Sequence, residues 1–182
     1  MENLRSSRLE SPLGQMLAVA SESGLCGLYL DGDPTGRRLD QWRRRFAPSS
    51  ELTELDAPDG FLGTLRDQLD RYFAGDLRRF DLELDARGTP FQREVWAELQ
   101  RIPFGRTASY GELGRRLGRP RASRAVGAAN GANPLPIVVP CHRVVAASGI
   151  GGFSGGLERK LALLRLEGVL LPTASSDRGL FD

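Results

Sequence analysis

The only histidine of the chain stands directly after one of its two cysteines, in the segment Pro140-Cys141-His142-Arg143-Val144. A thiolate, not a thiol, is the nucleophile, so a reactive cysteine needs a base or a positive charge nearby. His142 and Arg143 suit those tasks, which indicates nucleophilic chemistry at Cys141. A Cys-His pair after the short strand predicted over residues 137–139 is also common in purely structural positions. Neighbouring side chains of a strand point to opposite faces, so a bridging water is one way for the pair to act.

A glycine-rich loop and an unusually placed acid follow this segment. Five glycines lie within residues 149–156, so backbone N–H groups can come close to a ligand there. A helix is predicted from about Leu157 to a stop at Gly168. Glu167 falls in its last turn, where the helix dipole disfavours a carboxylate. An acid in that place suggests another task, such as orienting a base.

Three predicted helices must position the reactive segment. The first two begin with capping boxes, formed by Thr89 with Gln92 and by Ser109 with Glu112. The third begins after Pro120. Two helices joined by a short link with a glycine, inside a basic segment, predict a helix-turn-helix.

The third helix carries unusually small side chains. Its apolar stripe is predicted to face inward and comprises Ala122, Ala125, Val126 and Ala129. The opposite face comprises Arg124, Gly127, Ala128 and Gly131. Reading bases needs long amide or guanidinium side chains, and only Arg124 qualifies. The face therefore suits DNA binding without sequence readout, with a close helix–helix contact as the alternative.

The first part of the chain predicts a separate α/β unit that ends near residues 86–88. Cys26 falls in its second strand and is interpreted as a small core residue. The predicted strands cover residues 15–20, 25–30 and 80–84, and the predicted helices cover 62–75 and a short stretch around 43–45.

Composition narrows the classes of function. The chain has 182 residues, 40% hydrophobic and 26% charged, enough for one medium domain or two small ones. It lacks an apolar run of about 18 residues and a secretion signal, so we expect no membrane partner and a cytoplasmic location. Two cysteines and one histidine cannot build a four-ligand zinc site, so no metal is expected. Residues 1–100 carry 13 basic and 18 acidic side chains, whereas residues 101–182 carry 12 and 5, so a polyanion is attracted to the second part.

Several short motifs together resemble the O6-alkylguanine-DNA alkyltransferases. They are Ile102-Pro103-Phe104-Gly105, Ser109-Tyr110-Gly111, Ser123-Arg124-Ala125-Val126-Gly127, Asn133-Pro134, Pro140-Cys141-His142-Arg143-Val144 and Ser154-Gly155-Gly156. The resemblance is dense over residues 89–171. It implies an α/β (α+β) fold: a ribonuclease-H-like N-terminal domain with a small antiparallel sheet (1–87), a helix-turn-helix, winged-helix-like domain that binds the minor groove (88–172) and a tail (173–182).

The resemblance also implies a catalytic role for five residues. Cys141 accepts the alkyl group from guanine O6 in a single in-line displacement. His142 acts as a base through a water, and Glu167 orients it. Tyr110 donates to the purine N3, and Asn133 ties the recognition helix to the active-site turn.

Further residues are implied to form the substrate pocket. The carbonyls of Cys141 and Val144 accept from the exocyclic amine of guanine, and the N–H of Ser154 lies near O6. Pro136 and Gly156 line the alkyl pocket. Phe153, where the family commonly has tyrosine, packs against the base without a hydroxyl contact.

DNA binding is implied to involve nucleotide flipping, because stacking hides guanine O6 in a duplex. Arg124 takes the vacated place in the stack. The DNA-contacting residues are predicted to be Ser123, Arg124, Ala125, Gly127, Ala128 and Gly131. The partner is double-stranded DNA containing O6-alkylguanine, with no cofactor, and cooperative self-association on DNA stays open.

Two other classes of function compete with this interpretation. An alkyltransferase-like protein binds lesions without chemistry, but such proteins typically have tryptophan at the position of Cys141. A small helix-turn-helix regulator needs a base-reading helix, which the small residues of the third helix do not provide. The predicted thioether bond cannot be reversed by any group identified here, so each molecule is expected to act once.

Overall fold

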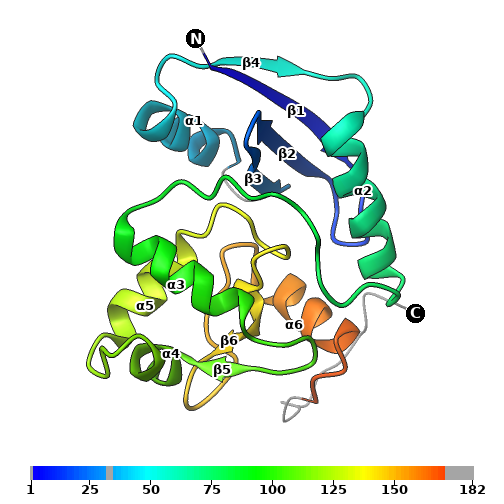
Figure 1. The fold of residues 1–182 in the computed structure, drawn as a ribbon. Coiled ribbons are helices and arrows are strands. Elements are labelled where there is room, and N and C mark those ends of the chain that lie inside the picture. Colours follow the sequence, from blue (N-terminus) through cyan, green and yellow to red (C-terminus); the bar gives the residue numbers. More distant parts are fainter. Residues whose placement is uncertain (1, 32–34, 171–182) are drawn as a thin grey trace.

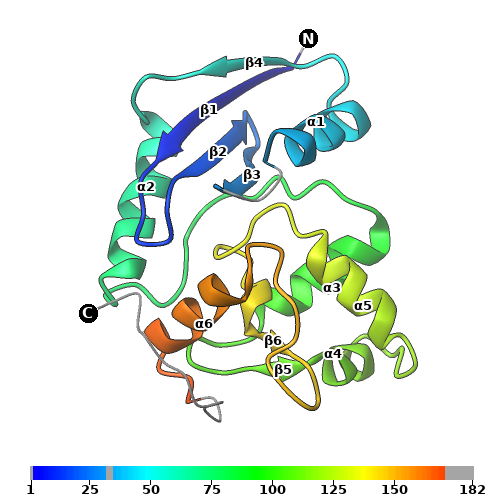
Figure 2. The ribbon, with the colours of Figure 1, turned by 180° about the vertical axis from the view of Figure 1, so that it is seen from behind.

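The computed structural model describes residues 2–31 and 35–170. A sheet with two helices forms the N-terminal region (residues 2–87), and a mainly helical C-terminal region (residues 88–170) lies below it in both views (Figure 1, Figure 2). The N-terminal elements are β1 (Asn3–Leu9), β2 (Met16–Ser21), β3 (Gly24–Leu30), α1 (Thr35–Phe46), β4 (Glu51–Glu54) and α2 (Gly60–Phe73). The sheet order is β3-β2-β1-β4, with β4 parallel to β1 and the other pairs antiparallel, so the sheet is mixed rather than wholly antiparallel.

Alternate side chains of the central strand β2 enter two separate cores. Ala18 packs into the core that contains α2 and the C-terminal helices, whereas Val19 packs into the core that contains α1. This alternation follows from the two-residue period of a strand. Both faces of the sheet are covered, and the larger core joins the two regions.

The N-terminal predictions are only partly correct. The strands predicted over 15–20 and 25–30 are confirmed as β2 and β3, and the two helices as α2 and the end of α1. The strand predicted over 80–84 is wrong, since this segment makes only an isolated bridge between Leu84 and Leu25. Strands β1 and β4 were not predicted, because neither has the alternating apolar pattern of a half-buried strand.

The C-terminal region begins with the predicted helices. Both predicted capping boxes are present, at Thr89–Gln92 and at Ser109–Glu112. The elements are α3 (Pro90–Gln100), β5 (Ala108–Ser109), α4 (Tyr110–Arg116), α5 (Ser123–Gly131), a 3-10 turn η1 (Cys141–Arg143), β6 (Val144–Val145) and α6 (Leu157–Leu166). The indole N–H of Trp96 donates to the carbonyl of Ala129 at 2.9 Å, which fixes α3 against α5. No helix within the described ranges is long and apolar enough to cross a membrane.

Candidate active site

A buried turn delivers Cys141, and the strand predicted over residues 137–139 is wrong. Ile137 has φ of 74°, in the left-handed region that β-branched residues rarely adopt, which no regular strand allows. The N–H of Cys141 bonds back to the carbonyl of Val139 at 2.8 Å. The apolar run is buried because it lies in the core, not because it pairs with a sheet. The following residues, Cys141–Arg143, form a 3-10 turn, so their side chains do not alternate as in a strand.

Two asparagines hold this turn to the end of α5. Asn133 donates from Nδ2 to the carbonyl of Val139 at 2.8 Å, and its Oδ1 accepts from the N–H of Leu135 at 3.0 Å. Asn130 donates from Nδ2 to the carbonyl of Cys141 at 3.4 Å. These contacts fit the tie between helix and turn that the resemblance implied for Asn133. Asn130 was missed, because its place on a predicted helix gave no sign of a partner eleven residues away.

Glu167 is the centre of a buried cluster of hydrogen bonds. Its Oε1 accepts from His142 Nε2 at 2.8 Å and from Tyr72 OH at 2.7 Å. Arg143 grips the carboxylate with two nitrogens, each at 2.8 Å. The N–H of Gly105 donates to Oε2 at 3.3 Å. Gly105 has φ of 73°, and a Cβ there would stand 2.9 Å from the Glu167 carbonyl, so glycine is required.

The protonation states of this cluster follow from burial and charge. Burial by itself raises the pKa of the Glu167 carboxyl, but hydrogen bonds from His142 and Arg143 outweigh it and lower the pKa to about 2. Burial lowers the pKa of His142 from its ordinary value, against the opposing effect of Glu167. With Nε2 bonded to Glu167, the remaining nitrogen Nδ1 is buried and has no hydrogen-bond partner among the described residues. A neutral imidazole with an unbonded Nδ1, on the residue that follows Cys141, has the form that a general base needs.

Lys160 is a further site residue that sequence reasoning missed. Its ammonium group is buried and donates to the carbonyl of Val144 at 2.6 Å and to that of Gly152 at 3.0 Å. It thereby joins the segment after Cys141 to the glycine-rich loop. Burial lowers the pKa of Lys160 to about 8, and its charge acts to lower the pKa of the Cys141 thiol. The available signal was that it is the single lysine of the chain.

Cys141 borders a cavity of about 180 Å³ beside α5. Burial raises the pKa of its thiol, while the hydrogen bond with Asn133 and the charge of Lys160 act in the opposite direction. The cavity is lined by Tyr110, Gly127, Asn130, Gly131, Cys141, Gly152, Phe153 and Ser154. Of the predicted pocket residues, Tyr110, Phe153 and Ser154 line this cavity. Pro136 and Val144 are instead buried outside this lining, and Gly156 is exposed before α6.

The predicted DNA-contacting residues lie on α5. Arg124, Ala128 and Gly131 are exposed, while Ser123 and Gly127 are half-buried. Ala125 is also exposed, so its predicted place in the inward-facing stripe is wrong, whereas Val126 and Ala129 are buried as expected. Ala122 precedes the helix as its N-cap and is half-buried against the core, so three of the four residues of the stripe face inward.

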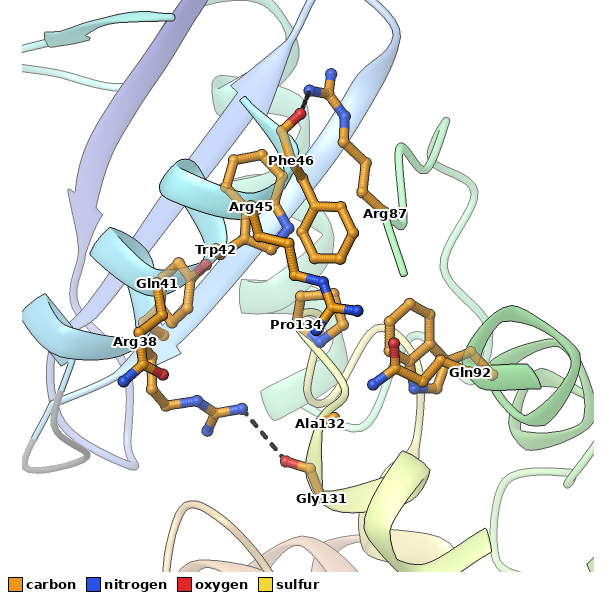
Figure 3. Close-up of a pocket in the computed structure, with 12 residues that line it drawn as sticks. Arg38, Gln41, Trp42, Arg45, Phe46, Arg87, Gln92, Gly131, Ala132 and Pro134 are labelled. Atoms are coloured by element: carbon orange, nitrogen blue, oxygen red, sulfur yellow. Dashed lines mark hydrogen bonds between the residues drawn. The ribbon is translucent and has the colours of Figure 1, made fainter. Parts of the chain in front are cut away.

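A second cavity, of about 250 Å³, lies between α1 and the end of α5. Figure 3 shows Arg38 reaching from α1 to the carbonyl of Gly131, a bond of 3.3 Å. Arg38 also donates to the carbonyl of Asn133 at 3.4 Å. Gly131 lines both this cavity and the cavity of Cys141.

The fold and the site define a two-part protein that carries a buried candidate nucleophilic cysteine next to a helix-turn-helix. Models of the 6-O-methylguanine DNA methyltransferase family match it twice, the ribonuclease-like domain over residues 4–86 and the DNA binding domain over residues 90–169. The chain therefore belongs to the 6-O-methylguanine DNA methyltransferase family. It is 46% identical over 175 residues to a methylated-DNA–protein-cysteine methyltransferase of Mycobacterium bovis, covering 96% of each chain. It is 59% identical over 160 residues to that of Mycolicibacterium paratuberculosis, covering 87% of this chain and 89% of the relative.

Solved structures agree with this assignment. The crystal structure of Mycobacterium tuberculosis OGT in complex with DNA superposes with a TM-score of 0.75 at 42% identity, covering 91% of this chain and 92% of that one. The crystal structure of an O6-methylguanine-DNA methyltransferase from the archaeon Pyrococcus kodakaraensis superposes with a TM-score of 0.66 at 30% identity, covering 91% of this chain and 99% of that one. Within the described residues, no group of three or more His, Cys, Asp or Glu side chains could hold a metal ion.

Proposed function

We propose that the chain repairs DNA by moving an alkyl group from O6 of guanine in a duplex to the sulfur of Cys141. Family membership makes it a methyltransferase of DNA repair, and its relatives include a protein solved with DNA. The observation that carries the proposal is the position of Cys141 on a cavity beside α5, next to a base held by a buried carboxylate.

The proposed reaction is a single displacement. The thiol proton passes through a water to His142 Nδ1, while Glu167 stays ionised and holds the ring by Nε2. The bond from sulfur to the alkyl carbon forms as the bond from that carbon to O6 breaks. The Tyr110 hydroxyl stabilises the departing guanine anion by a hydrogen bond to N3, and it keeps its own proton because burial raises its pKa. The guanine then takes up one proton from water, and the proton on His142 is released to water. The product is a thioether, and the protein is used once without a cofactor.

The substrate reaches Cys141 only if its nucleotide leaves the stack. We assign the place in the stack to the exposed guanidinium of Arg124, and the backbone contacts to the small residues of α5. The other pocket roles, for Phe153, Ser154, Pro136, Val144 and Gly156, follow the family resemblance and belong to this proposal. We also propose that the chain divides into two domains between residues 87 and 88 and that the protein is cytoplasmic.

Intact-mass spectrometry tests the proposal. After incubation with duplex DNA that contains O6-methylguanine, one methyl group should replace the hydrogen of one thiol, and peptide mapping should place it on Cys141. Undamaged duplex is the control. Folded protein that binds the damaged duplex without any gain in mass would point to lesion binding without chemistry and would reject transfer.

The role of Arg124 has its own test. Arg124→Ala should slow repair of duplex DNA far more than reaction with free O6-benzylguanine, because only the duplex requires extrusion. Arg121→Ala, at another exposed arginine before α5, is the matched control. Equal losses on the two substrates would remove Arg124 from base extrusion.

A further inference from the structure

The N-terminal region reaches the reactive centre through one buried tyrosine. Tyr72 lies in the last turn of α2, and its hydroxyl donates to Glu167 Oε1 at 2.7 Å, although 95 residues separate the two in sequence. Its side chain is fully buried and Glu167 is 4% exposed, so water does not compete for this bond. The contact joins α2 directly to the carboxylate that holds His142.

The same oxygen serves three donors. Besides Tyr72, Glu167 Oε1 accepts from His142 Nε2 at 2.8 Å and from Arg143 at 2.8 Å. Each donor withdraws part of the negative charge from that oxygen, so each hydrogen bond weakens the other two. The hydroxyl therefore acts on the bond between Glu167 and His142 without touching the imidazole.

We propose that Tyr72 is a positioning residue for alkyl transfer, which acts through Glu167 on His142 and makes the N-terminal region a working part of the reactive centre. This inference rests on the function proposed above, in which His142 is the base. It gives the sheet region a task beyond packing against the helices.

The chemistry of the pair sets the direction of the effect. Burial and the neighbouring Glu167 charge raise the pKa of Tyr72, so its hydroxyl keeps its proton and remains a donor. Without that hydroxyl, Oε1 carries more charge toward His142 and stabilises the imidazolium form. The pKa of His142 then rises, and the base is lost to protonation at a higher pH.

Other groups around the pair must be held constant in the test. Arg143 from the same turn and Lys160 from α6 are the remaining charged groups that act on His142 or on its partner Glu167. A change at Tyr72 leaves both of them in place. The conservative variant Tyr72→Phe removes one oxygen and keeps the ring, which packs against Phe73, Phe80 and Phe104.

The experiment combines kinetics with a direct titration. Single-turnover transfer from O6-methylguanine duplex is followed from pH 5.5 to 8.5, and the one histidine of the chain is titrated by NMR after selective labelling. For Tyr72→Phe we expect the midpoint of the fall in transfer rate at acid pH and the pKa of His142 to rise together by about one pH unit. The rate should fall most at the acid end of this range, by at most about ten-fold for a shift of one pH unit, and by less than about two-fold above pH 8.

A matched control comes from the same region. Tyr29→Phe removes the hydroxyl of another buried tyrosine, on β3, away from Glu167. It should leave both the pH profile and the histidine titration unchanged. A folded Tyr72→Phe protein with wild-type profiles would overturn the inference, since a merely structural role would lower stability without moving either.

A second variant covers the case in which Tyr72→Phe does not fold. Replacement of Tyr72 by 3-fluorotyrosine keeps the hydroxyl and makes it a stronger donor, so the His142 titration should move down instead of up. No movement would again overturn the inference. Wild-type protein that gains no methyl group would reject the proposed function itself, whereas wild-type transfer with unchanged variant profiles would reject only the role of Tyr72.

Discussion

Cys26 in the N-terminal sheet and Cys141 in the turn before β6 are both buried, and burial raises the pKa of both thiols. Their surroundings differ in what opposes burial. The thiol of Cys26 lies on β3 near the carbonyl of Val19 at 3.3 Å, and its pKa reaches about 12. Cys141 instead has Asn133 and Lys160 acting to lower its pKa, and it borders a cavity. Reactivity is therefore a property of the neighbours and of access, not of the degree of burial.

The largest expected effect comes from removing each sulfur in turn. Cys141→Ala should abolish alkyl transfer while the protein still binds duplex DNA, and Cys26→Ala should retain full transfer. Peptide mapping after reaction with O6-methylguanine duplex checks both. A methyl group on Cys26 of the Cys141→Ala protein, or none on Cys141 of the Cys26→Ala protein, would break the comparison between the two thiols.

The Glu167 cluster predicts acid sensitivity in the region of Cys141. The pKa of the Glu167 carboxyl is about 2 in the folded protein, below the ordinary 4.5. As the pH falls, the unfolded chain therefore binds a proton at Glu167 before the folded protein does. This stabilisation is present above about pH 5. Between pH 5 and pH 2 its loss lowers the free energy of unfolding by about 3 kcal/mol. Urea unfolding at several pH values measures it. Glu167→Gln should lack this component, and an identical acid slope in that variant would contradict the assignment.

Removing the charge of Lys160 should make Cys141 behave more like Cys26. Lys160→Met leaves two carbonyls without their donor and removes a cation that favours the thiolate, so reaction with iodoacetamide at pH 7 should slow about ten-fold. Arg159→Met, one position earlier on α6, is the control and should change the rate little. Equal rates for the two variants would show that Lys160 does not tune the thiol.

The smallest effect is expected in the sheet. Cys26→Ala removes a sulfur from a packed strand and should lower the free energy of unfolding by about 1 kcal/mol, with no change in transfer rate. Chemical denaturation of the variant measures the loss. A slower transfer by this variant would mean that the sheet acts on the site through Cys26 as well as through α2.

The sequence predicted the parts of the structure that depend on near neighbours. Both capping boxes join residues three apart, and Gly168 adopts positive φ after the helix that it was expected to end. The motif around Cys141 located the candidate nucleophile, and the odd placement of Glu167 indicated a partner. Each of these signals is contained in a few consecutive residues.

The rest of the site depends on distant contacts. Tyr72 has the same spacing as the apolar residues of α2, so nothing local distinguishes its hydroxyl from a core ring. Lys160 is the single lysine of the chain, but nothing in the residues around it indicates its two carbonyl partners. Residues 137–139 have the composition of a strand, and only tertiary packing decides that they form a turn. Strand β1 was missed because buried Ser6 and Ser7 take the places where apolar residues were expected.

Gly131 has a consequence for the design of inhibitors. It lines two cavities, one bordered by Cys141 and the other bounded by Arg38 and Pro134. A hydrogen-bond donor placed in the second cavity would compete with Arg38 for the Gly131 carbonyl. Because Gly131 also lines the cavity of Cys141, we expect such a compound to slow alkyl transfer without resembling a damaged base.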